Sequence, residues 1–213
     1  MAGSFILGTV VFQSCGNRDS TNANANKDTT ITTQTKDSMT TNNPGNNDLM
    51  AAMHKSMQEM KMTGDFDVDF ANTMSTHHQE AIDMSEVELA KGNDSQVKGW
   101  AQNIITAQKA EIDQLQQVIK NYSSSGKAME GDHNELKGAM DKMMNEMMTM
   151  KMTGNTDKDF VMMMVMHHET AMGMAKTEIS KGKNAELKKM AQKIVEDQSK
   201  EIDEFRNWLD KNK

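Results

Sequence analysis

The chain has 213 residues, of which 26% are charged and 4% aromatic, and its formal net charge is −7. This length suits one domain of ordinary size plus a tail. The negative charge and the lack of a basic cluster exclude nucleic acid as a partner, because such binding needs Lys and Arg gathered on one face. The charge itself implies only a weak general attraction for cations.

Residues 1–15 resemble a bacterial lipoprotein signal. The apolar run Phe5–Phe12 is too short to cross a membrane, and it leads to Cys15, the single cysteine of the chain. We therefore expect Cys15 to be lipidated and to anchor the protein to a membrane outside the cytoplasm, in the periplasm or at the cell surface. No Lys or Arg precedes the apolar run, so an ordinary N-terminal segment with an incidental thiol is the alternative.

Residues 16–48 are rich in Asn and Thr and contain the only proline, Pro44. They lack the apolar side chains that offset the entropy of ordering, which predicts a disordered tether. A flexible coil of about 33 residues spans roughly 30 Å.

Residues 49–213 contain a sequence repeat with a constant offset of 90, over residues 50–122 and 140–212. The motif MKMTG at Met60–Gly64 returns at Met150–Gly154, and HHQEAIDM at His77–Met84 returns as HHETAMGM at His167–Met174. Each copy predicts a short Met-rich helix and two long helices whose apolar residues recur every three or four positions. Strand signals are absent. The expected long helices run from Asp65–Asp69 to Gly92, from Asp94 onward, from Thr156 to Lys181 and from Asn184 to Leu209.

Short connections make the two long helices of a copy antiparallel neighbours, and two such hairpins predict a ferritin-like four-helix bundle. Gly92 is expected to end its helix in the left-handed conformation. The longer link Ser123–Asn134 is the expected crossover between the copies.

The paired histidines are candidate metal ligands: His77 and His78 in copy one, His167 and His168 in copy two. Adjacent helical residues diverge by about 100°, so one histidine of each pair is expected in the core and the other at its edge. Methionines share the same stripe, at Met74, Met84, Met164 and Met174. Imidazole with thioether favours Cu(I) and Ag(I), whereas imidazole alone also accepts Zn, Ni or Cu(II). Core histidines held by hydrogen bonds are the alternative.

Four polar residues lie at or near the inward stripe of the second long helices, where leucine is the usual residue: Gln108, Glu111, Gln198 and Glu201. A buried polar group needs a partner. These side chains either orient the metal-binding imidazoles or fix the helix register, and the sequence leaves both interpretations open.

The short helices carry most of the other methionines. These residues are secondary candidate ligands, namely Met50, Met53, His54, Met57, Met60 and Met62 in copy one, and Met140, Met143, Met144, Met147, Met148, Met150 and Met152 in copy two. Methionine also fills irregular gaps in a core. However, leucine specifies a core better, and the second long helices use Val, Ile, Leu and Trp instead. This selective use of sulfur indicates thioether chemistry, because methionine stays a soft ligand where cysteine is oxidised.

The pattern F-x3-M-x2-HH-x2-A-x2-M, from Phe70 to Met84 and from Phe160 to Met174, is followed in each copy by A-Q-x-I-x3-Q-x2-EI. It resembles the bacterial family called domain of unknown function 305, over about Met50 to Leu209. The resemblance implies a ferritin-like helical bundle. It also associates the chain with copper, since the family includes the CopM-type extracytoplasmic copper-binding proteins.

The expected function is therefore non-enzymatic: an extracytoplasmic protein that sequesters Cu(I) or hands it to a transfer partner. Carboxylate-bridged di-iron bundles need Glu-x-x-His on two helices, and neither histidine pair has a Glu three residues before it. Two rivals remain. One is a metalloenzyme or a Zn or Ni binder that uses the histidines only, and the other is a metal-free module whose Met-rich face binds a hydrophobic partner.

Overall fold

The computed structural model describes residues 62–122 and 134–213, which belong to one compact unit, Thr40–Lys213. Helices α2 (Phe66–Lys91) and α3 (Ser95–Asn121) form the first hairpin, and α5 (Thr156–Lys181) and α6 (Ala185–Lys211) form the second. The Met-rich helix of copy two is α4 (Asn134–Thr149). No strand occurs in these two ranges, which confirms the all-helical fold. The signal segment, the tether, the first Met-rich helix and the crossover link lie outside the described residues.

The long helices begin where the sequence predicts, because each is preceded by an Asp or Asn whose side chain accepts hydrogen bonds from the first backbone N–H groups. Asp94 Oδ1 accepts from the N–H groups of Gln96 and Val97 at 2.8 and 3.0 Å. Asn184 does the same in copy two, at 2.9 and 3.0 Å. These caps set the start of both outer helices at equivalent positions of the repeat.

The end of α2 differs from the prediction. Gly92 has φ −67°, and its counterpart Gly182 has φ −59°, so neither is left-handed. A Cβ at Gly92 would lie 1.9 Å from Oε1 of Glu88, and one at Gly182 would lie 2.0 Å from Oε1 of Glu178. Glycine is required at both positions because a buried glutamate folds back over the helix end.

The left-handed glycines lie in the repeated MKMTG motif instead. Gly64 has φ 87° and Gly154 has φ 85°. In copy one the turn is closed by Asp69, whose Oδ1 accepts from the backbone N–H and the hydroxyl of Thr63 at 2.6 and 2.7 Å. Copy two repeats both bonds between Thr153 and Asp159 at 2.7 Å. The turn connects the Met-rich segment of each copy to the start of the long helix that follows it.

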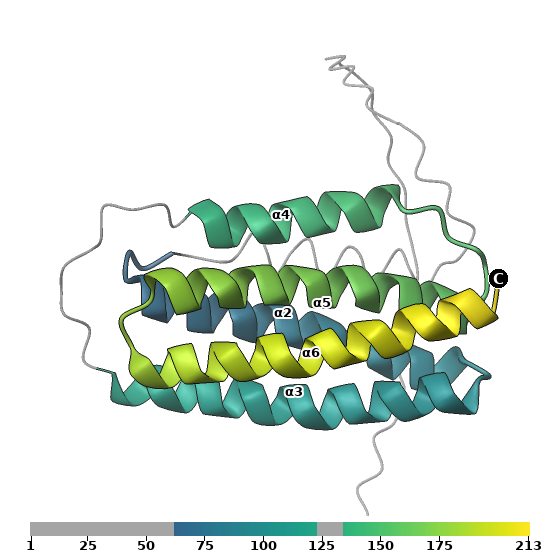
Figure 1. Ribbon diagram of the computed structural model, residues 1–213, viewed down its shortest axis with the longest axis horizontal. Coiled ribbons are helices and arrows are strands. Elements are labelled where there is room, and N and C mark those ends of the chain that lie inside the picture. Colours follow the sequence, from purple (N-terminus) through teal and green to yellow (C-terminus); the bar gives the residue numbers. More distant parts are fainter. Residues whose placement is uncertain (1–61, 123–133) are drawn as a thin grey trace, which may run out of the picture. The chain divides into compact units, whose positions relative to one another are not determined.

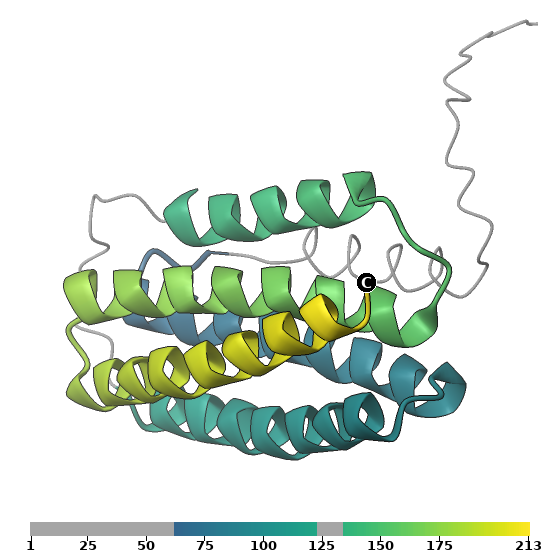
Figure 2. The same ribbon diagram turned by 45° about the vertical axis from the view of Figure 1, so that its right-hand side comes forward.

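The helices lie in three layers (Figures 1 and 2). Helices α2 and α5 form the middle layer, α3 and α6 cover one side of it, and α4 lies over the other. Most residues of α2 and nearly half of those of α5 are buried, whereas α3 and α6 bury a single stripe. A helix covered on two sides buries more of its surface than a helix with a single apolar stripe.

Among the described helices, none combines the length and the apolar character that a membrane span requires.

Two carboxylates join the repeats to each other at opposite ends of the middle layer. Oδ1 of Asp157, at the start of α5, accepts from the backbone N–H groups of Asn93 and Asp94 at 2.9 and 2.7 Å. Oδ1 of Asp67, at the start of α2, accepts from the backbone N–H groups of Lys183 and Asn184 at 2.8 and 2.9 Å. Each inner helix therefore begins against the loop where the other copy's hairpin turns, so α2 and α5 run antiparallel.

A buried glutamate accompanies each of these aspartates. Burial, together with a hydrogen bond to Asp157 and the charge of Asp157, raises the pKa of Glu88 to about 8. Burial, with the charge of Asp67 and a hydrogen bond to it, raises the pKa of Glu178 to about 9. Both glutamates are therefore protonated at neutral pH, which removes the repulsion between two buried anions.

These acid pairs predict a stability that declines as the solution becomes alkaline. The folded protein keeps a proton on Glu88 and on Glu178 that the unfolded chain loses above its ordinary pKa of 4.5. The stabilisation is complete below that pH and is lost as the pH rises through about 8 to 9. We expect the urea concentration at the unfolding midpoint to fall as the pH rises through this window. The double variant Glu88→Gln/Glu178→Gln keeps an N–H donor in place of each protonated carboxyl group and has no proton to lose, so its midpoint should change less with pH.

The matched control is Glu86→Gln/Glu169→Gln, which changes exposed glutamates of the same two helices. It should keep the wild-type pH profile. An identical decline in both double variants would contradict the assignment of the protons to Glu88 and Glu178.

Candidate metal centre

The middle layer brings the four repeated histidines to one place. The rings of His77 on α2 and His167 on α5 lie face to face, with centroids 3.6 Å apart and planes 33° apart. In each pair the second ring lies 6.2 Å from the first, for His77 and His78 and for His167 and His168. All four side chains are fully buried. The expected position of one histidine at the edge of the core is wrong, because α3 and α6 cover the side of the middle layer on which the edge residue was expected.

The facing pair has an unusual lack of hydrogen bonds. Within residues 62–122 and 134–213, neither Nδ1 nor Nε2 of His77 or His167 has a hydrogen-bond partner. A buried polar atom without a partner costs about 1–3 kcal/mol. The four nitrogen atoms of the two rings therefore lie in the protein interior without a hydrogen bond of ordinary geometry to the described residues.

Burial lowers the pKa of His77 and of His167 well below 6.5, and the neighbouring imidazoles lower it further. A charged imidazole would lose its hydration in the core and would repel the facing ring. Both rings are therefore neutral at pH 7. A neutral imidazole has one nitrogen lone pair free for a metal ion.

The outer histidines contact the glutamates of the covering helices. Nε2 of His168 lies 2.8 Å from Oε2 of Glu201 in a hydrogen bond, and Nε2 of His78 lies 3.0 Å from Oε2 of Glu111. A carboxylate in contact with Nε2 fixes the orientation of the histidine ring. Nδ1 is then the nitrogen that remains for a metal ion. Nδ1 of His78 and of His168 has no hydrogen-bond partner in the described chain.

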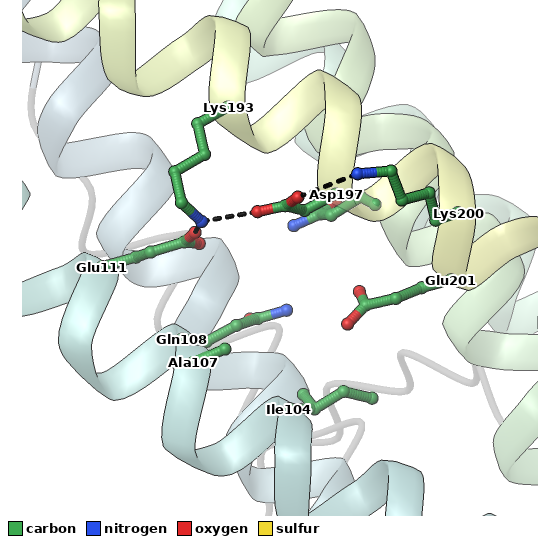
Figure 3. A pocket seen from close by; sticks show the side chains of 9 residues that line it. Ile104, Ala107, Gln108, Glu111, Lys193, Asp197, Lys200 and Glu201 are labelled. Atoms are coloured by element: carbon green, nitrogen blue, oxygen red, sulfur yellow. Dashed lines mark hydrogen bonds and ion pairs between the residues drawn. The ribbon is translucent and has the colours of Figure 1, made fainter.

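The two glutamines lie beside these glutamates but make different contacts. The side chains of Gln108 and Gln198 are 2% and 4% exposed, and neither Oε1 atom has a partner among the described residues. They line a pocket of about 260 Å³ between α3 and α6 (Figure 3). The same pocket is lined by Ile104, Ala107, Glu111, Lys193, Asp197, Lys200 and Glu201.

The methionines of the histidine stripe are buried, with Met74 and Met164 at 0% and Met84 and Met174 at 1% exposure. A helix rises 1.5 Å per residue, which places Met74 about 4.5 Å along the axis from His77 and Met84 about 10.5 Å from it. The same offsets hold for Met164 and Met174 about His167. Because α2 and α5 are antiparallel, Met74 and Met164 lie on opposite sides of the facing rings, one helical turn away.

The other candidate methionines fall into three groups. Four on α4 are buried in the hydrophobic core against the middle layer: Met140, Met143, Met144 and Met147. Three connecting residues are partly buried, namely Met62, Met150 and Met152, and Met148 is 40% exposed. The remaining candidates, Met50, Met53, His54, Met57 and Met60, lie outside the described residues, as does Cys15. Packing thus accounts for the four core methionines of α4 without a metal.

The usual ligand side chains do not complete a site of three. In the described parts of the chain, no group of three or more His, Cys, Asp or Glu side chains is placed to hold a metal ion. A third ligand at the facing histidines would therefore be an atom of another kind. Met74 and Met164 carry thioether sulfurs about one helical turn from the two histidines.

Comparison with solved structures identifies proteins of the same fold. CopM in its Cu(I)-bound form matches with 27% identity and a TM-score of 0.52, over 68% of this chain and 96% of CopM. CopM in an Ag-bound form matches with 28% identity and a TM-score of 0.52 over the same shares. A fragment of a protein with the same domain of unknown function, from Deinococcus radiodurans, matches with 22% identity and a TM-score of 0.52, over 68% of this chain and 96% of the fragment. No curated protein sequence matches the chain.

The match to a family model extends over both repeats. The model described as "Domain of unknown function (DUF305)" matches residues 16–119 and again residues 67–209. The two matches together span the paired histidines, the glutamines and the glutamates of both copies. The chain belongs to the DUF305 family.

Proposed function

We propose that this protein binds Cu(I), or the chemically similar Ag(I), outside the cytoplasm, and sequesters the ion or transfers it rather than catalysing a reaction. The facing pair His77 and His167 is the primary site, and Met74 and Met164 supply the first thioethers. The observation that carries the proposal is the set of unpartnered ring nitrogens in the core. A metal ion between the helices would supply the missing partner.

The chemistry of the available atoms supports a soft ion. Neutral imidazole and thioether both bind Cu(I) and Ag(I), whereas thioether is a poor ligand for Zn(II). Because the described residues offer no trio of His, Cys, Asp or Glu side chains, a Zn or Ni site built from histidines alone has less support. The similarity to CopM, whose structures contain Cu(I), Cu(II) and Ag, points to the same class of ion.

The surface of the described chain gives little support to the metal-free rival. Met148 is the one large hydrophobic side chain of the described residues that is exposed, and the other methionines of α4 are buried or partly buried. A methionine surface that adapts to a partner needs several exposed side chains next to each other. The lipid anchor at Cys15 and a copper-transfer partner remain predictions of the sequence.

The first test replaces the facing imidazoles by an apolar side chain of similar size. His77→Leu/His167→Leu should lose at least about 100-fold in Ag(I) affinity, because the two nitrogen ligands are gone. The metal-free variant should nevertheless unfold at a higher urea concentration than the wild type, because the unpartnered buried nitrogens are removed. Anaerobic titration with Ag(I) and Cu(I) and urea unfolding measure the two effects.

Phe70→Leu/Phe160→Leu is the matched control, since it changes equivalent core positions of the same helices without removing a nitrogen or sulfur atom. It should lower the urea midpoint and leave the affinity unchanged. Wild-type affinity in the histidine variant would refute the site. Tight Zn(II) binding by the wild type without Cu(I) uptake would favour the rival that uses histidines only.

The second test separates methionine ligands from methionine packing. Leucine is close in volume to methionine, so both variants should keep their helical content. Met74→Leu/Met164→Leu should weaken Ag(I) binding by about 10-fold or more, because the soft donors one turn from the histidines are lost. Met140→Leu/Met143→Leu, which changes buried residues of α4, should bind Ag(I) with the wild-type affinity and stoichiometry. Fewer bound equivalents in the α4 variant would instead identify that helix as a second site.

A further inference from the structure

The pocket between α3 and α6 is connected to the buried histidines through Glu111. Its Oε2 lies 3.0 Å from Nε2 of His78, and its Oε1 lies 3.8 Å from Nζ of Lys193 at the surface. One carboxylate therefore contacts a core imidazole with one oxygen and a solvent-exposed ammonium with the other. Glu201 lines the same pocket and reaches His168 in the same way, at 2.8 Å.

The interior of the pocket has oxygen atoms that lack partners. Oε1 of Gln108 and Oε1 of Gln198 have none among the described residues, although both side chains are more than nine-tenths buried. Figure 3 shows the amide of Gln108 and the carboxylate of Glu201 facing each other across the opening. Amide and carboxylate oxygens are weak ligands for a soft ion, so they can replace water around it in transit without retaining it.

Two lysines lie at the opening, Lys193 and Lys200, and both contact Asp197. Nζ of Lys193 contacts Oδ2 of Asp197 at 2.5 Å as well as Glu111, and its side chain is 66% exposed. The equivalent position of copy one, 90 residues earlier, is Asn103, which is uncharged. Lys193 therefore contacts Glu111 from the outside, whereas Asn103 carries no charge that could contact Glu201 in the same way. Lys200 pairs with Glu196 and Asp197.

We propose that this pocket is the entrance through which the metal ion reaches the histidines. Glu111 and Glu201 receive the ion from solvent and pass it to His78 and His168, whose rings are 6.2 Å from the facing pair, and Lys193 opposes its arrival at Glu111. This inference rests on the proposed binding of Cu(I) or Ag(I) at the histidines. It adds a route and a rate-controlling residue to that site.

The first experiment narrows the opening and measures rates. Ala107 lines the pocket on α3, and Ala110 is an exposed alanine one turn further along that does not line it. Ala107→Trp should slow the uptake and the release of Ag(I) by a similar factor of about 10 or more, so that the affinity stays within about 2-fold of the wild type. Ala110→Trp should keep the wild-type rates. Stopped-flow competition with a chromophoric chelator gives both rate constants.

The second experiment removes the opposing charge. Lys193→Gln should speed Ag(I) uptake several-fold at low ionic strength, and added salt should reduce this gain because it screens the charge. Lys142→Gln makes the same change of net charge on α4, where its nearest partner is Glu146. This control should leave the rate close to that of the wild type.

The outcomes separate the entrance from the site itself. If the wild type and every variant bind Ag(I) with the same rate constants, the pocket is not the entrance, although the histidine site stands. Equal acceleration by Lys193→Gln and Lys142→Gln would reduce the lysine effect to net charge and overturn its role at the opening. If the wild type takes up no Ag(I) or Cu(I), the proposed function fails and the entrance fails with it.

Discussion

The antiparallel packing of α2 against α5 is the contact on which the rest of the structure depends. Because the two helices are copies of each other, packing them about a two-fold relation brings equivalent residues face to face. His77 meets His167 at the centre, and Asp67 and Asp157 meet the opposite hairpin turns at the two ends. One repeated helix sequence thus specifies both histidines of the central contact and both aspartates that bind the hairpin turns at the two ends.

This arrangement buries many polar groups of the middle layer. Each buried polar side chain then needs a partner within the protein. Asp69 and Asp159 satisfy that requirement in the MKMTG turns, and Asp67 and Asp157 satisfy it at the hairpin turns of the other copy. The ring nitrogens of the facing histidines do not satisfy it, and natural proteins often retain such a cost at a functional site.

Methionine serves two physical purposes in this chain. On α4 it fills the contact with the middle layer, a role that needs an adaptable apolar side chain and no particular chemistry. On α2 and α5 it lies one turn from unpartnered imidazoles, where its sulfur is the soft donor that the two rings lack. The same residue type therefore lies in two different environments, the contact of α4 with the middle layer and the histidine stripe of α2 and α5.

The sequence by itself determined the helices and the repeat, because caps such as Asp94 and Asn184 and the three-and-four spacing of apolar residues are local signals. It also identified the paired histidines and the glutamates that approach them. It did not determine that His78 and His168 are buried, since this requires α3 and α6 to cover the middle layer. It misjudged Gly92 for a similar reason: the glycine accommodates the folded-back Glu88, not a left-handed cap. Only the tertiary structure decided that His77 faces His167, because the contact joins residues 90 positions apart and depends on how the two copies pack.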